Sequence, residues 1–299
     1  MTNIIDQPVH LIWIGNPMSD QIKECMNTAF EVYKDHPLYL WTESSVFETG
    51  NGLGHEYMQA RLLEGLKLSN VRIMNVHDYD YHEIFTQCTY EGQDRVIAKG
   101  LRLDIKCDLY RLCILQEYGG IYLDSDYYHL KSYANELAKH EAALVQCNRQ
   151  RIHGNGVMYV DRPNHPWIND CIARCISYPN FLYNRILYCG PNAAYKTRNA
   201  NKDKYEVYSI PFEHFFTHAW EEIEKICSEA LMNHEQPDLS YEPRNDLYAI
   251  HLWYDVLSQW EHALHAKLNI ISANKEPYTK DKKHKKPKSA KKSQKKAQK

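Results

Sequence analysis

Apolar and polar positions along the chain follow two patterns, continuous apolar runs and apolar residues at helical spacing, which predict alternating strands and helices. A continuous apolar run at 9–14 predicts a fully buried strand. Apolar residues at helical spacing then predict a helix over 19–34, with Ser19 as its N-cap, and a second buried strand follows at 38–41. A strand, helix, strand succession implies a right-handed crossover and a parallel sheet, with ligands near the carboxyl ends of its strands.

The remaining pattern extends this α/β arrangement through most of the chain. Residues 199–205 are expected to form a polar, exposed segment. A late edge strand is expected at 208–211, where a proline ends the run. Further helices are expected at 55–68, 136–140 and 167–176, and further strands at 71–76, 142–146, 154–160 and 249–253.

The segment 101–128 has the clearest pattern in the chain. Its apolar residues gather on one side of a predicted helix, which leaves Asp108 and Arg111 on a polar edge. Gly119 and Gly120 should end this helix, because glycine adopts a positive φ without steric penalty. The apolar residues that follow predict a short buried strand.

Two carboxylates, Asp124 and Asp126, come directly after this strand. In extended chain, residues i and i+2 point to the same side, so both carboxylates can face one ion. Their mutual repulsion favours a hard divalent cation that keeps room for substrate oxygens. An isolated D-x-D is also a common turn sequence, so the spacing alone is a weak signal.

The residues around the D-x-D make it specific. A D-x-x-R helix (Asp108, Arg111) leads into the string YGGIYLDSD, and together they resemble the DXD-containing sugar-binding region of glycosyltransferases. That family includes the Och1-like mannosyltransferases and the large glucosylating toxins. The resemblance implies a GT-A type α/β fold, in which a mainly parallel central sheet, flanked by helices and with helical insertions, binds a nucleotide sugar. It also implies that Asp124 and Asp126 hold Mn²⁺ or Mg²⁺ on the diphosphate of a UDP- or GDP-sugar.

The same resemblance implies roles for residues elsewhere in the chain. Trp13, in the string HLIWIG, matches a tryptophan that lies against the nucleotide base, and Asp108, Arg111 and Tyr122 are assigned to donor binding. Asn155 is assigned to catalysis with the two aspartates, and His251 in an A-x-H string to the metal. Ser258 and Trp260 correspond to a Ser-Trp pair that closes over the phosphates, although Gln259 is inserted between them. Residues 189–192 resemble the family's short Gly-Pro loop, which faces the acceptor side.

Three of these residues also have a purely structural interpretation. Trp13 and His251 both lie in apolar strands, where a core position is common, and Asn155 follows a glycine as turn residues often do. The residues therefore leave both interpretations open. Their order along the chain, from Trp13 to Trp260, is what agrees with the family.

The implied reaction moves a hexose from a nucleotide sugar to a hydroxyl of a glycan, glycoconjugate or other acceptor, with retention of configuration. One alternative is a haloacid-dehalogenase-like phosphatase, in which the first aspartate of D-x-D is the nucleophile. That class places D-x-D-x-T/V on an early strand, whereas here the motif lies mid-chain and Tyr127 and Tyr128 follow it. A non-enzymatic binding protein is the other alternative, and it would leave the coincidence of motifs unexplained.

Composition places the chain among globular proteins that remain in a reducing compartment. Of its 299 residues, 43% are hydrophobic and 25% charged, and the nine cysteines form no C-x-x-C pair. The 23 tyrosines suit a partly wet groove such as a carbohydrate site. We see no secretory signal and no apolar run of about 20 residues that could cross a bilayer, and therefore expect a cytoplasmic enzyme of bacterial or viral type.

The last 20 residues differ sharply from the rest. Lys280 to Lys299 contain 11 lysines and one aspartate, although the whole chain has a net charge of −2. We therefore expect an acidic catalytic domain over 1–276 and a disordered lysine-rich tail over 277–299. The tail would bind weakly to anionic membranes or nucleic acid, or simply be solvated.

Overall fold

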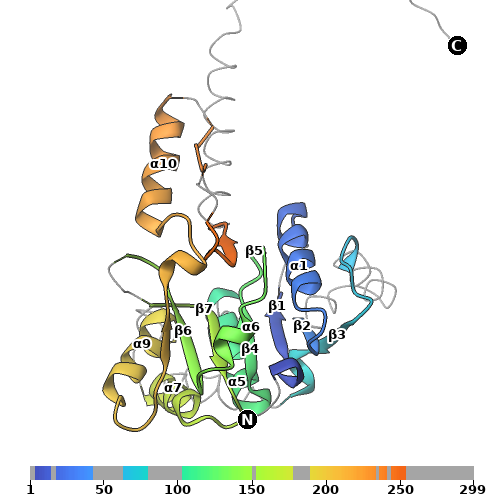
Figure 1. The fold of residues 1–299 in the computed structure, drawn as a ribbon, viewed down its shortest axis with the longest axis vertical. Coiled ribbons are helices and arrows are strands. Elements are labelled where there is room, and N and C mark those ends of the chain that lie inside the picture. The colour runs from blue at the N-terminus through green and yellow to red at the C-terminus, as the bar shows by residue number, and fades with distance from the viewer. Residues whose placement is uncertain are drawn as a thin grey trace, which may run out of the picture.

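A seven-stranded sheet forms the centre of the molecule (Figure 1). The computed structural model of the chain describes residues 4–14, 18–42, 63–79, 103–149, 153–177, 189–233, 236–240 and 244–253. The strands lie in the order β3-β2-β1-β4-β7-β6-β8. Their bounds are Val9–Ile12 (β1), Leu38–Thr42 (β2), Val71–Asn75 (β3), Gly120–Leu123 (β4), Ala142–Gln146 (β6), His153–Val160 (β7) and Tyr208–Ile210 (β8).

Parallel pairing dominates this sheet. Strands β1 to β4 are parallel to one another, and β8 pairs in parallel with β6 at the sheet edge. Strand β7 runs antiparallel to both of its neighbours, β4 and β6. The mainly parallel sheet and the late edge strand that the sequence predicts are therefore confirmed.

Helices cover both faces of the sheet. On one face lie α5 (Leu103–Tyr118), α7 (Pro166–Ser177) and α9 (Pro191–Ala200), and on the other lie α1 (Asp20–Val32) and α6 (Ala134–Leu137). Short 3-10 helices occur at Ile4–Asp6 (η1), Val76–Asp78 (η3) and Phe212–His214 (η4).

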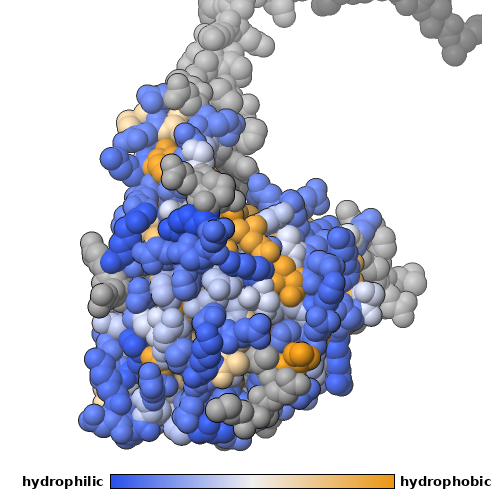
Figure 2. All heavy atoms as spheres, viewed as in Figure 1, coloured by the Kyte–Doolittle hydropathy of each residue, from blue (hydrophilic) through white to orange (hydrophobic). Residues whose placement is uncertain are grey.

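The two faces of the sheet belong to two separate cores. Trp41 and Tyr122 pack with α5, α7 and α9, whereas their chain neighbours Leu40 and Ile121 pack with α1 and α6. This alternation is the period of two expected for strands that are buried on both faces. Hydrophilic residues cover most of the outer surface seen in Figure 2.

A second, two-stranded sheet brings the late chain to the end of β4. It pairs β5 (Tyr127–His129) with β9 (Ala249–His251) in antiparallel register, so that Tyr127 lies opposite His251. Helix α10 (Trp220–Asn233) extends beyond this small sheet, at the far end of the molecule from α7 and α9 (Figure 1). The small sheet thus places a residue from near position 250 beside the carboxylates at 124–126.

Most predicted elements are present. Ser19 caps α1, because its hydroxyl accepts a hydrogen bond from the backbone N–H of Ile22 at 3.3 Å. Gly119 and Gly120 have φ values of +66° and +87°, as the predicted helix end requires. The helix predicted at 136–140 begins and ends earlier, as α6. Within the described residues, none of the helices has the length and apolar character needed to cross a membrane.

Three expectations were wrong. The segment expected as a Gly-Pro loop begins helix α9, with Gly190 at its N-cap and Pro191 in the first turn, where proline needs no N–H partner. Tyr205, expected in an exposed segment, is buried. Arg111, expected on a polar helix edge, is also buried, because it pairs with carboxylates inside the protein. Helix α10 was not anticipated.

Candidate active site

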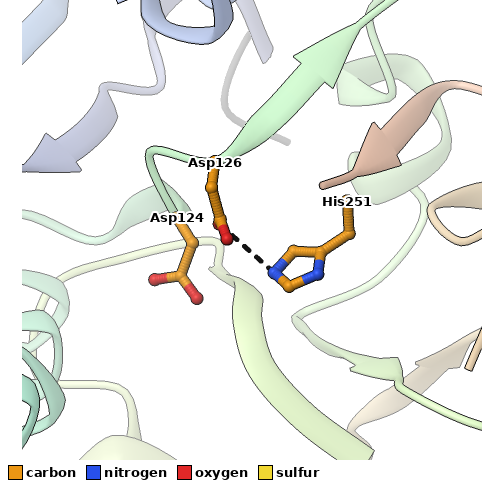
Figure 3. A group of neighbouring side chains, drawn as sticks. All are labelled: Asp124, Asp126 and His251. Atoms are coloured by element: carbon orange, nitrogen blue, oxygen red, sulfur yellow. Dashed lines mark ion pairs between the residues drawn. The ribbon is translucent and has the colours of Figure 1, made fainter. Parts of the chain in front are cut away.

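Three side chains converge where β4 ends. Asp124 and Asp126 come from the turn between β4 and β5, and His251 comes from β9 (Figure 3). One potential ligand atom from each lies within 4.8 Å of the others, and His251 Nε2 is 3.2 Å from Asp126 Oδ1. The sequence predicted that extended backbone would point both aspartates to the same side. In the structure a turn at 125–126 brings them together instead.

The three groups suit a divalent cation. Two carboxylate oxygens match the preference of Mg²⁺ and Mn²⁺ for oxygen, while the imidazole nitrogen is a ligand that transition metals accept more readily than Mg²⁺ does. All three residues are partly exposed, so a metal held here would remain open to a substrate oxygen. This donor set therefore fits a divalent cation.

The carboxylate of Asp124 is fixed by one of its oxygens. Oδ1 accepts a hydrogen bond from the Tyr122 hydroxyl at 2.6 Å and lies 3.1 Å from Arg111 Nη1. Oδ2 is used by neither contact. A Cβ atom at Gly156 would lie only 2.7 Å from this Oδ2, so glycine at that position leaves it the room it needs. The geometry thus leaves one oriented oxygen of Asp124 for a ligand.

Arg111 holds this arrangement together from behind. Its guanidinium donates to the backbone oxygen of Asn155 at 2.7 Å, lies 3.2 Å from Asp108 Oδ1, and sits 4.7 Å from the centre of the Tyr122 ring. Burial by itself would lower the pKa of Arg111, but the nearby Asp124 carboxylate raises it above its usual value. The arginine therefore stays charged and offsets the two buried or half-buried carboxylates that it contacts.

Asp108 completes the group behind Asp124. Asn155 Nδ2 donates to Asp108 Oδ1 at 2.7 Å. Burial raises the pKa of Asp108 to about 6, although Arg111 and the Asn155 hydrogen bond act in the opposite direction. We call Tyr122, Arg111, Asp108 and Asn155 the support cluster, because each holds Asp124 or holds a residue that does.

A pocket of about 480 Å³ opens in front of the aspartates. Its size is that of a small-molecule site. Its lining combines polar residues, which are Asp124, Asp126, Asn155 and Asn192, with aromatic ones, which are Tyr127, Phe216, Trp220, His251 and Trp253. A larger surface hollow of about 850 Å³ lies between α1 and the 64–67 segment, but neither aspartate lines it.

The structure brings together seven of the residues that the sequence singled out. Asp124, Asp126 and His251 form the candidate metal site, and Asp108, Arg111, Tyr122 and Asn155 form the support cluster. Trp13 lies half-buried after β1, against the core on the α1 face of the sheet, and is not among the residues that line the pocket. Ser258 and Trp260 lie outside the described residues, as does the lysine-rich tail.

Sequence reasoning missed Gly156 and the aromatic residues of the pocket. Gly156 lies inside a predicted strand, where a glycine signals a close approach of another group, and that signal could have identified it. Phe216 and Trp220 carry no motif, since their place in the site depends on how the late chain folds back. Trp253 lies two residues after His251, so its position near the candidate metal site could have been predicted from the sequence.

Comparisons with known proteins agree with this geometry. Residues 19–144 match the family described as "Glycosyltransferase sugar-binding region containing DXD motif". A toxin of Photorhabdus asymbiotica is 31% identical over 134 residues, which make up 44% of this chain and 4% of the toxin. The solved structure of the PaToxG glycosyltransferase is 21% identical, covers 88% of this chain and 78% of its own, and superposes with a TM-score of 0.50.

These matches confirm two expectations. The D-x-D lies inside the matched segment, so the resemblance to the DXD-containing glycosyltransferases holds beyond the motif itself. The likeness to PaToxG shows that the α/β fold is of the GT-A type. The chain spans only a small fraction of the toxin that it resembles in sequence.

Proposed function

We propose that this protein is a metal-dependent glycosyltransferase, which moves a sugar from a nucleotide sugar to an acceptor hydroxyl. One observation supports this most strongly. His251, from the last described strand, meets the two aspartates of the D-x-D at ligand distance, although more than 120 residues of sequence separate them. The family match over 19–144 and the GT-A type fold favour the same reaction.

The residues divide into those that hold the metal and those that position them. Asp124, Asp126 and His251 would bind the cation, which when present supplies positive charge for the leaving diphosphate. Arg111 and Tyr122 fix the orientation of Asp124, and Asp108 fixes Arg111 in turn. Because these contacts are made by the protein's own side chains, they would hold Asp124 in one orientation toward the cation.

Donor binding extends from the metal in two directions. Trp13 lies at the end of β1, the strand beside β4, where it would stack on the nucleotide base. Asn155 lies in β7 on the other side of β4 and lines the pocket, where it would approach the sugar. The roles of Ser258 and Trp260 over the phosphates stay predictions.

The finer details of the reaction also stay predictions. They are a hexose as the transferred sugar, a UDP- or GDP-linked donor, retention of configuration, a glycan or glycoconjugate acceptor and a cytoplasmic location. The phosphatase alternative is not favoured, since the family match and the fold both point to glycosyl transfer. In addition, one oxygen of Asp124, which would be the nucleophile, is already bound by Tyr122 and Arg111.

The direct experiment incubates the protein with a panel of UDP- and GDP-sugars, with Mn²⁺, with Mg²⁺ or with EDTA. Released nucleotide diphosphate and released inorganic phosphate are measured separately. We expect nucleotide diphosphate to be released only with a divalent cation, faster with Mn²⁺, and not in Asp126→Asn. Release of phosphate without nucleotide diphosphate would instead indicate a phosphatase, and turnover that EDTA does not affect would contradict a metal-dependent reaction.

A further inference from the structure

A chain of aromatic rings runs from the candidate metal site to the rim of the pocket. The centre of the His251 ring is 4.2 Å from that of Trp253, at an interplanar angle of 81°. Trp253 in turn lies 5.4 Å from Trp220, edge to face, and 5.5 Å from Phe216. All four side chains line the same pocket as the two aspartates. We call Phe216, Trp220 and Trp253 the aromatic wall.

Trp253 is held in its place at a conformational cost. Its φ is +51°, a left-handed conformation that is a genuine outlier for a bulky residue. Its indole N–H donates to the backbone oxygen of His218 at 3.0 Å, which fixes the ring between His251 and Trp220. Strain of this kind persists where the surrounding structure enforces it, and it concentrates at ligand sites.

Trp220 presents the outer part of the wall to solvent. It is the first residue of α10 and retains 40% of its accessible surface, whereas Phe216 is buried. The side chain of Glu222 accepts a hydrogen bond from the backbone N–H of Ala219 at 2.8 Å, which fixes the start of α10. A large aromatic side chain thus lines the pocket with part of its surface uncovered, which leaves that surface available to a bound molecule.

The aromatic wall lies on the side of the metal site that the nucleotide would leave free. Strand order places β1, with Trp13 at its end, on one side of β4, and β7 on the other. The pocket is lined from β7, from the start of α9 and from α10, so it lies across the aspartates from Trp13. A donor whose base stacks at Trp13 and whose diphosphate meets the metal would leave the outer part of the pocket for the acceptor.

We propose that the aromatic wall is the acceptor subsite of this enzyme, and that Trp220 is the platform on which a saccharide ring of the acceptor stacks. The proposal rests on the glycosyltransferase function proposed above. Sugar rings have an apolar C–H face and a rim of hydroxyls. The electron-rich face of an indole attracts the C–H face, and the pocket-lining side chains of Asn155, Asn192 and Asp126 can form hydrogen bonds with the hydroxyls.

The backbone around the pocket favours a saccharide over an extended peptide. Peptides are commonly captured by adding a strand to an open sheet edge. Strand β7, which lines the pocket, is already paired on both sides, and the backbone N–H of His251 in β9 donates to Phe215 oxygen at 3.1 Å. Recognition through the side chains that line a pocket, as here, suits a compact ring.

The test compares Trp220→Ala, Trp220→Phe and the full-length wild type. A glycan array, incubated with Mn²⁺ and the nucleotide sugar that the wild type turns over, first identifies the glycans that it modifies. Steady-state kinetics on one soluble glycan from that set then give the KM for the acceptor. We expect Trp220→Ala to raise this KM at least about fivefold, in line with a lost stacking contact, while the KM for the donor changes far less. Trp220→Phe should recover most of the loss.

Met232→Ala is the matched control. Met232 lies on the same helix, is 67% exposed and does not line the pocket, so its loss should leave both KM values unchanged. An unchanged acceptor KM in a folded Trp220→Ala variant would show that Trp220 is not the platform for the acceptor. A wild type that releases nucleotide but labels hydroxyl-bearing peptides and no glycan would overturn the saccharide class. Failure of the wild type to consume any nucleotide sugar would instead contradict the proposed function itself.

Discussion

Asp108 and Asp124 both contact the guanidinium of Arg111, yet their surroundings differ. The side chain of Asp108 is only 16% exposed, and Asn155 and Arg111 both bind its Oδ1. Asp124 is 28% exposed at the mouth of a pocket, and it keeps Oδ2 directed away from the contacts that hold it. The same residue type thus serves as an anchor in one place and as a candidate ligand in the other.

The difference shows how the fold prepares a charged site. A half-exposed carboxylate is flexible unless something holds it, and here a buried, permanently charged arginine does so. That arginine is itself stable inside the protein only because a second carboxylate and a backbone oxygen share its charge. Substitutions on the two sides of Arg111 should therefore have different effects, on activity at Asp124 and on stability at Asp108.

The largest effect is expected for Asp124→Asn. This change removes the charge of a proposed metal ligand but keeps the shape of the side chain, so nucleotide release should fall by about 10³-fold or more while the protein still folds. Initial rates with Mn²⁺ and circular dichroism give the two readouts. Asp246→Asn, an exposed aspartate paired only at the surface, is the control and should keep full activity.

A smaller loss of activity is expected for Gly156→Ala. The added Cβ would lie 2.7 Å from Asp124 Oδ2 and 2.9 Å from the Tyr127 hydroxyl, so the aspartate must move. Disturbing a group that orients a metal ligand typically costs about 10- to 100-fold in metal affinity or activity. The midpoint of activation by Mn²⁺ is the measurement.

Gly154→Ala on the same strand is its matched control. There the new Cβ would meet the side chain of Cys147 at 3.1 Å and would not contact Asp124. We expect its Mn²⁺ midpoint to stay close to that of the wild type. Equal shifts in the two variants would show that strand packing, and not the position of Asp124, limits activation.

Arg111→Lys should act mainly on stability. Lysine keeps the charge but lacks the planar fork that reaches Asp108, Asp124 and the backbone of Asn155 together. We expect the free energy of unfolding to fall by about 1–3 kcal/mol, the cost of leaving buried polar groups unpaired. Chemical denaturation of this variant and of Arg162→Lys, where the ion pair is exposed, gives the comparison, and the latter should change by less than about 0.5 kcal/mol.

A second effect on stability, of similar size, concerns pH. Burial raises the pKa of Asp108 to about 6, so the folded protein keeps a proton on this carboxyl that the unfolded chain, with an ordinary aspartate, has already released. The contribution of Asp108 to stability is therefore greatest at low pH and falls by about 1–3 kcal/mol as the pH rises from about 4 to 6. Denaturation at several pH values should show that slope in the wild type and a shallower one in Asp108→Asn. Identical slopes would show that Asp108 is not the source of this pH dependence.

Local pattern predicted the parts of the site that lie within one stretch of chain. The buried strand 120–123, its end at two carboxylates and the glycines before it all follow from spacing and from the steric freedom of glycine. The burial of Arg111 could not be predicted in this way, because a helical wheel places it beside polar residues. Its partners Asn155 and Asp124 reach it only through the pairing of β4 with β7.

Contacts made by the late chain were hardest to predict. His251 was singled out only through the family resemblance, and its distance to Asp126 depends on the β5 and β9 pairing. The aromatic wall carries no sequence signature, since Trp220 begins α10 whereas Phe216 follows η4 and Trp253 follows β9. The same limit applies to helix α9, where a Gly-Pro pair that resembles a loop starts a helix instead.

The central claim is that Asp124, Asp126 and His251 hold one divalent cation. Isothermal titration calorimetry with Mn²⁺ and the metal-free protein tests this claim without donor or acceptor. We predict one site in the wild type, binding weakened at least about tenfold in Asp126→Asn and in His251→Ala, and no change in Asp246→Asn. Equal Mn²⁺ affinity in all four proteins would contradict the account.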